Sequence, residues 1–222
     1  MRDRMKTKSK IEVSVVMFFT FAIVIVAPMV FKHIGNDILK MSIKPLLYIL
    51  LVGTPFIVCK IMKSSIGTLG FRKGELLKQL LIGVEIFMVL AFFLTIAVFI
   101  LGNNKGMLLS TKENRIGIIV YYIIFDMLFV GMGEEMLFRG YFMERFHTMT
   151  NSGTWAVAIS ALMFGIWHFP NGQDFLQVIL TALIGVILGL AKLKIKNCST
   201  LSLGIAHGLH DVYILILSCI LL

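Results

Sequence analysis

The stretch that decides the fold is residues 116–146, which read IGIIVYYIIFDMLFVGMGEEMLFRGYFMERF. A continuous helix over this stretch would be ~46 Å long at about 1.5 Å per residue. That length exceeds the ~30 Å hydrocarbon core of a bilayer. Glu134 and Glu135 then lie past the middle of the helix and not at its end. The stretch therefore predicts a membrane-spanning helix with two carboxylates inside it.

The rest of the chain is as apolar as this stretch. Of its 222 residues, 58% are hydrophobic and 15% charged, against about 45–50% and about 25% in soluble domains. The apolar residues come in blocks of roughly 20, the length that a helix needs to cross a bilayer. These blocks exclude a disordered chain and predict an all-α fold, a polytopic transmembrane helix bundle of about seven spans, with six to eight possible. The expected spans cover residues 12–33, 43–62, 79–101, a stretch that starts at 116, 154–169, 174–193 and 200–222.

The basic residues indicate the orientation of the bundle. The net charge of +9 comes from lysines and arginines that gather in 1–10, 60–78 and 192–198, next to apolar blocks. A nucleic-acid-binding domain would carry them as a stripe on one face. Under the positive-inside rule these three segments lie in the cytoplasm. We therefore expect a multi-pass protein of the cell membrane with a cytoplasmic N-terminus, a lipid bilayer around it and no nucleic-acid partner.

Ionisable residues inside the predicted spans are the candidate functional residues, because each costs at least ~2.5–3.5 kcal/mol to insert. In the fourth span Glu135 and Arg139 are four residues apart, so they share a helix face and can pair. Glu134 is rotated about 100° from Glu135, which leaves its carboxylate free for chemistry. Taken alone, the pattern is equally typical of a helix that emerges from the membrane with solvated charges.

Two later spans carry polar residues at the same spacing. Phe164 and His168 are four residues apart in the fifth span. His207 and Asp211 are four apart in the seventh, and His210 is rotated away from them. A single histidine at a helix end is more often a satisfied interfacial residue than a functional one. Three polar stripes on three spans are much harder to explain in that way, so we expect them to enclose a polar cavity inside the bundle.

The motifs Glu-Glu-x-x-x-Arg, Phe-x-x-x-His and His-x-x-x-Asp, in this order, resemble those of the CAAX protease and bacteriocin-processing (CPBP) family. The Ras-converting CAAX endoprotease belongs to that family of membrane proteins. The similarity covers about residues 125–213, and Leu-Gly-Phe-Arg at 69–72 fits the looser pattern of bacterial members, as does the small size of the chain. We expect residues 1–222 to form a single integral-membrane domain, with N-terminal spans in 1–101 and a catalytic core in 116–222.

No motif residue is missing, so the resemblance implies an active intramembrane protease, a hydrolase that acts on peptide bonds. It would cleave a membrane-associated protein or peptide precursor with water that glutamate and histidine activate. Glu134 would be the general base, and His168 would orient and deprotonate the water. His207 and Asp211 would stabilise the oxyanion. The supporting residues implied by the motifs are Glu135, Arg139 and Phe164.

The acid in the third motif limits what that position can do. The family allows asparagine or aspartate there, and this chain has Asp211. An ionised carboxylate cannot donate a hydrogen bond, and it repels an oxyanion. Either Asp211 stays protonated, or it accepts a hydrogen bond from His207 or His210 and leaves donation to an imidazole.

We expect no cofactor, but three other functions stay open on the sequence. A zinc enzyme is the nearest, because Glu134, His168 and His207 could supply three ligands with water as the fourth, although no His-Glu-x-x-His helix is present. A non-catalytic protein of bacteriocin self-immunity, or a scaffold, is the second. A transporter is the third, although the first three spans offer few polar groups beyond Glu12 and Glu85. The sequence leaves the substrate and the oligomeric state undecided.

Overall fold

The computed structural model describes residues 2–101, 108, 113–171 and 175–222, and over these ranges it contains helices and no strand. Its elements are α1 (Arg2–Lys32), α2 (Asp37–Ile61), α3 (Leu76–Leu101), α5 (Ile116–Phe125), η1 (Asp126–Gly131), α6 (Met132–Glu135), η2 (Met136–Phe142), α7 (Met143–Thr150), α8 (Gly153–His168), η3 (Phe169–Asn171), α9 (Phe175–Lys194) and α10 (Thr200–Leu221). Six helical segments of the described chain are long and apolar enough to cross a membrane, and α8 is a shorter apolar helix. The predicted all-α polytopic bundle is therefore confirmed.

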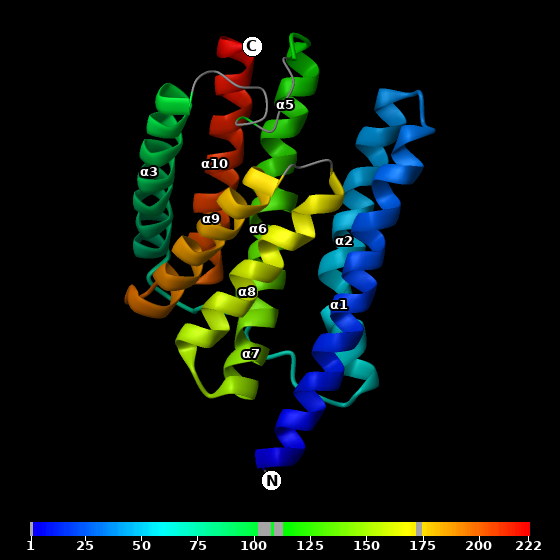
Figure 1. Ribbon diagram of the computed structural model, residues 1–222, viewed down its shortest axis with the longest axis vertical. Coiled ribbons are helices and arrows are strands. Elements are labelled where there is room, and N and C mark those ends of the chain that lie inside the picture. Colours follow the sequence, from blue (N-terminus) through cyan, green and yellow to red (C-terminus); the bar gives the residue numbers. More distant parts are fainter. Residues whose placement is uncertain (1, 102–107, 109–112, 172–174) are drawn as a thin grey trace.

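When the shorter α8 is counted with the six longer segments, successive helices alternate in direction along the bundle (Figure 1). Helices α1 and α2 lie side by side as one antiparallel pair, and α8 and α9 form another. The start of α1, the α2–α3 connection and the α9–α10 connection lie toward the end of the bundle that holds the N-terminus, whereas the C-terminus lies at the other end. The basic segments thus share one end of the bundle, which is the arrangement that positive-inside topology requires. Which side of the membrane this end faces stays a prediction.

Residues 116–150 form one continuous helical rod, but it is not a uniform α-helix. The segments η1 and η2 are π-helical, and the single α-helical turn of α6 lies between them. A π-helical turn bonds each N–H to the carbonyl five residues back and is wider than an α-helical turn. The predicted helix is confirmed, and its pitch differs from that of an α-helix over η1 and η2. Both glutamates stand on one α-helical turn between two widened ones, a feature that is frequent at functional sites.

Aromatic packing holds α8 against this rod. The rod continues to Thr150, well past Glu134, and α8 begins at Gly153 and runs back along it. The Phe138 ring of η2 meets the rings of Phe164 and Trp167 in α8, with centroids 4.9 and 5.3 Å apart. These contacts are edge-to-face, the geometry that aromatic pairs prefer. They place the C-terminal end of α8 beside the turn that carries the glutamates.

The Leu-Gly-Phe-Arg segment at 69–72 wedges between η2 and the start of α10. The carbonyl of Gly70 accepts a hydrogen bond of 3.0 Å from the backbone N–H of Thr200, and the hydroxyl of Thr200 donates to the carbonyl of Leu69. Gly70 has φ +73°, a left-handed conformation that favours glycine. A Cβ at Gly140 of η2 would lie 2.5 Å from the Leu69 oxygen, so this side of the rod must also stay bare. The segment therefore fixes the rod relative to α10.

The rod and α10 cross in direct backbone contact. A Cβ at Gly131 would lie 2.5 Å from the nitrogen of Gly208 and 2.6 Å from the carbonyl oxygen of Gly204. Small residues at such crossings let membrane helices approach closely, where van der Waals packing holds them together. Because backbone atoms cannot move aside as a flexible side chain can, the crossing leaves no room for a methyl group.

We expect Gly131→Ala to lower the thermal stability of the protein, because the new methyl group forces the rod and α10 apart at a cost of about 1–3 kcal/mol. Gly117→Ala is the matched control, since a Cβ at Gly117 in the same rod would meet nothing within 4 Å. That control should unfold at the wild-type temperature or slightly above it. Thermal unfolding in detergent micelles, followed by tryptophan fluorescence, compares the two. Equal melting temperatures would contradict the close crossing.

Candidate active site

The motif residues of three spans meet at one cavity of about 210 Å³ inside the bundle. Glu134 lines it from α6, and His168 lines it from the C-terminal end of α8. His207 and Asp211 line it from α10. The structure thus brings together the polar stripes that the sequence places on separate spans.

Glu134 has one oxygen held by the protein and one that faces the histidines. The Tyr48 hydroxyl donates a hydrogen bond of 2.9 Å to Oε1. Oε2 lies 3.5 Å from Nε2 of His168 and 4.0 Å from Nε2 of His207. No described residue forms a hydrogen bond with Oε2, and the side chain is 3% exposed. This oxygen is therefore a buried acceptor of the cavity that the described chain leaves without a hydrogen bond.

The orientation of His168 is set by its own helix. Its Nδ1 lies 2.8 Å from the carbonyl oxygen of Phe164, one turn earlier in α8. A carbonyl can only accept, so Nδ1 carries the proton, and Nε2 holds the lone pair when the ring is neutral. Nε2 is also the atom that faces Glu134. The Phe164 ring packs edge-on against His168, with centroids 4.6 Å apart, which gives the phenylalanine of this motif a role in fixing the imidazole.

Glu135 lies behind the cavity and joins two helices. Its Oε1 accepts hydrogen bonds from Nη1 of Arg139 at 2.6 Å and from Nδ1 of His207 at 3.0 Å. The side chains of Glu135 and Arg139 are 0% and 1% exposed, so neither charge is solvated. The Arg139 guanidinium also lies 4.3 Å from the centroid of the Phe164 ring, a cation–π arrangement. The structure pairs Glu135 with Arg139 as their spacing predicts.

His207 is surrounded by carboxylates. Beyond its contact with Glu135, Nε2 lies 3.4 Å from Oδ2 of Asp211 and 4.0 Å from Oε2 of Glu134. Three carboxylates thus lie around one imidazole, and both of its ring nitrogens face acid oxygens. Asp211 therefore lies beside His207, where one of the two roles that the sequence leaves to it, accepting a hydrogen bond from this imidazole, stays a prediction.

Sequence reasoning missed Tyr48, which comes from α2 and lies outside the motifs. Its ring packs edge-on against Phe125, with centroids 5.2 Å apart, and its hydroxyl holds Oε1 of Glu134. An uncharged tyrosine in an apolar span gives no signal that separates a hydrogen-bond donor from ordinary packing. Tyr48 is nonetheless the donor that leaves only one oxygen of Glu134 free.

The expectation that His210 is rotated away from His207 and Asp211 is wrong. His210 is 3% exposed and lines the same cavity as His207. Positions i, i+3, i+4 and i+7 share one face of a helix. Helix α10 presents such a stripe to the cavity, consisting of His207, His210, Asp211 and Ile214.

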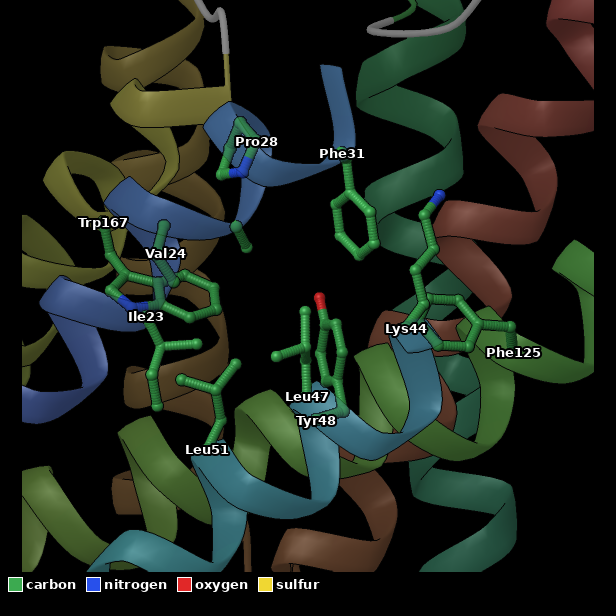
Figure 2. A pocket seen from close by; sticks show the side chains of 11 residues that line it. Ile23, Val24, Pro28, Phe31, Lys44, Leu47, Tyr48, Leu51, Phe125 and Trp167 are labelled. Atoms are coloured by element: carbon green, nitrogen blue, oxygen red, sulfur yellow. The ribbon is translucent and has the colours of Figure 1, made fainter. Parts of the chain in front are cut away.

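A second cavity, of about 250 Å³, lies between α1, α2, α5 and the end of α8. Figure 2 shows Tyr48 rising from α2 into its middle, with Trp167 and Val24 on one side and Lys44 and Phe125 on the other. Its lining is largely apolar, and Nζ of Lys44 donates a hydrogen bond of 2.9 Å to the hydroxyl of Tyr122. Because Tyr48 lines both cavities, it forms a wall that the two share.

The residues that the sequence offers as zinc ligands, Glu134, His168 and His207, do face one another in the cavity. Across the ranges that the structure describes, however, no group of three or more His, Cys, Asp or Glu side chains is placed to hold a metal ion. Metal-free hydrolysis stays our prediction, with zinc as the alternative to test.

Comparison with known proteins supports the resemblance seen in the motifs. Residues 116–213 match the family model described as Type II CAAX prenyl endopeptidase Rce1-like. The match spans the rod, α8, α9 and the part of α10 that carries the histidines, and it confirms the resemblance to the CAAX protease family. No curated protein and no solved structure matches the chain. Tyr48 lies outside the matched segment.

We expect Arg139→Gln to destabilise the protein by about 3–5 kcal/mol, because it removes the guanidinium that pairs with the buried carboxylate of Glu135. Arg115→Gln is the matched control, since the Arg115 side chain is 62% exposed and its ion pairs lie at the surface. The control should unfold at the wild-type temperature. Thermal unfolding in detergent measures both. If the two variants unfolded at the same temperature, the buried Glu135–Arg139 pair would not contribute to stability.

Proposed function

We propose that this multi-pass membrane protein, with its Rce1-like segment, is an intramembrane endopeptidase that hydrolyses a peptide bond in a membrane-associated protein or peptide precursor. The family match implies a CAAX-type protease and a peptide substrate. The observation that carries the proposal is Oε2 of Glu134, which lacks a hydrogen-bond partner in the described chain and faces two imidazoles across the cavity. A buried carboxylate held at one oxygen and free at the other is suited to general base catalysis.

In the proposed reaction, a water molecule beside Glu134 gives a proton to Oε2 while its oxygen attacks the scissile carbonyl carbon. Nε2 of His168 accepts a hydrogen bond from the same water and so orients it. The C–N bond of the tetrahedral intermediate then breaks, and the proton held by Glu134 passes to the leaving amine. The products are a new carboxyl end and a new amino end, so the reaction consumes only water.

The charges behind the cavity support this chemistry. Arg139 and the imidazole of His207 supply positive charge close to both glutamates, which lowers the cost of an ionised Glu134 in an apolar bundle. Because Arg139 and Nδ1 of His207 both donate hydrogen bonds to Glu135, these groups stabilise Glu134 through their charge and leave its Oε2 oxygen without a hydrogen bond. The base therefore stays both charged and accessible.

The N-terminal spans complete the site in this proposal. Tyr48 of α2 holds Glu134 although the Rce1-like segment begins only at residue 116. We assign catalysis to 116–222 and the substrate-facing wall to 1–101. By the positive-inside rule we place the end of the bundle that holds the N-terminus in the cytoplasm of the cell.

Replacing Glu134 with glutamine should reduce peptide hydrolysis by at least about a hundredfold. Glutamine still accepts a hydrogen bond from Tyr48 but cannot take a proton from water. The assay uses purified protein in liposomes and a mixture of internally quenched peptides with apolar residues on both sides of the central bond. Glu85→Gln, an exposed glutamate of α3, is the control and should keep wild-type activity.

Excess EDTA should leave the wild-type rate unchanged in the same assay. A rate that is lost in EDTA and restored by added zinc would replace the metal-free mechanism with a zinc mechanism. Full cellular function of both Glu134→Gln and His168→Ala would contradict the protease and support the immunity or scaffold alternative.

We further propose that the second cavity receives an apolar side chain of the substrate, next to the bond that is cleaved. The cavity shares Tyr48 with the site of Glu134, so a side chain bound there belongs to a residue close to the scissile bond. Its volume of about 250 Å³ and its largely apolar lining suit a large aromatic or aliphatic group. A substrate segment that enters a bilayer is rich in such groups.

Filling this cavity should weaken the binding of peptides with a large apolar residue. Ala27 lines it from α1, whereas Val26 of the same helix is 52% exposed on the outer surface. We expect Ala27→Phe to raise KM roughly tenfold, equivalent to ~1.4 kcal/mol, for peptides with Phe or Leu beside the cleaved bond, and less for peptides with Ala there. Val26→Phe should leave KM unchanged. If Ala27→Phe also left KM unchanged, the side chain would bind elsewhere.

A further inference from the structure

His210 is a buried polar side chain of the cavity to which the proposed reaction gives no role. It is 3% exposed, and neither of its ring nitrogens has a hydrogen-bond partner in the described part of the chain. An imidazole always carries at least one N–H, and an N–H that is buried without an acceptor costs free energy. Because the unpartnered N–H of His210 faces a cavity, a ligand bound in that cavity can supply the missing acceptor.

The other imidazoles of the cavity are already engaged. Nδ1 of His168 is bound by the Phe164 carbonyl, and its Nε2 faces the base Glu134. Both nitrogens of His207 face carboxylates. The N–H groups of these two imidazoles are therefore directed at protein acceptors, and they are not free to donate to a negative charge that develops on the substrate.

Tyr48 and Asp211 are also unsuited to donate to an oxyanion. Thr181 lines the cavity as well, but its hydroxyl is not among the buried polar atoms that the described structure leaves without a partner. Tyr48 donates its proton to Glu134. Asp211 lies within 3.4 Å of His207 as an acceptor, and an ionised carboxylate repels a developing negative charge. Among the side chains that line this cavity, the described structure leaves buried polar atoms without a partner on two, Glu134 and His210. One is an acceptor and the other brings a donor.

We propose that a ring N–H of His210 donates a hydrogen bond to the carbonyl oxygen of the scissile bond and stabilises the oxyanion that forms there. This assignment rests on the proposed peptidase function. Glu134 and His210 reach the cavity from different helices, α6 and α10. A substrate carbonyl between them would meet the activated water on one side and the imidazole on the other. His207 and Asp211 then act as the charged pair that positions Glu134, and His210 is the catalytic donor.

The test compares His210→Phe, which keeps the ring shape but has no donor, with His210→Gln, which keeps an N–H donor. Both are assayed in liposomes with the quenched peptide that the wild-type protein cleaves fastest. Removing one oxyanion donor lowers kcat by about 10²–10³-fold, so we expect a fall of this size for His210→Phe with KM nearly unchanged. His210→Gln should retain most of kcat. His147→Phe on the exposed face of α7 is the matched control and should behave as wild type.

The outcomes separate this inference from the function on which it rests. Wild-type protein that cleaves none of the peptides overturns the peptidase proposal and the role of His210 together. Wild-type cleavage that depends on Glu134, with kcat of His210→Phe within twofold of wild type, overturns the role of His210 alone. Equal losses in His210→Phe and His210→Gln with lowered melting temperatures indicate a structural role and also overturn it. If the phenylalanine variant does not fold, His210→Ala removes the donor and is held to the same criteria.

Discussion

The arrangement of the whole site depends on one buried carboxylate, that of Glu135. It accepts from Arg139 within the rod and from His207 on α10, so a single group sets both the local register of the rod and its position against the last span. A charge left unpaired inside a protein costs several kcal/mol. A translation or rotation of α10 would separate His207 from Glu135 and leave a buried group without its partner. The interaction therefore selects one relative placement of the two helices, and in that placement Nε2 of His207 faces Glu134 and Asp211.

This pairing requires that the two backbones come close, and the glycines permit it. Gly131 of the rod meets Gly204 and Gly208 of α10 with no space for a Cβ. The widened turns of η1 and η2 lie on either side of the turn that holds the glutamates. Adjacent glutamates then serve different ends: Glu135 points to the interior pair, and Glu134 points to the cavity. Close packing and local pitch thus convert two neighbouring carboxylates into one structural group and one chemical group.

The sequence predicts the features that depend on the cost of burying charge, and it misses those that depend on neutral groups and on backbone detail. Glu134, His168 and His207 stand out because ionisable residues are expensive in a bilayer. Tyr48 carries no charge, so nothing in an apolar span distinguishes it from packing residues. The π-helical turns change hydrogen-bond partners without changing the apolar pattern of residues 116–146. The i,i+4 spacing of His207 and Asp211 gives no indication of His210, although i,i+3 neighbours such as His207 and His210 share the same face.

The polar groups of the cavity, taken together, form a balanced set. Each donor of Tyr48 and His207 is directed at an acid oxygen, and Nδ1 of His168 is directed at a backbone carbonyl. Among the side chains that line this cavity, the described structure leaves buried polar atoms without a partner on two, one oxygen of Glu134 and the ring nitrogens of His210. Hydrolysis of a peptide bond makes two demands, an acceptor for the proton of water and a donor for the oxyanion. In the function proposed here, this open acceptor and donor match the polarity of the transition state of peptide hydrolysis before any substrate binds.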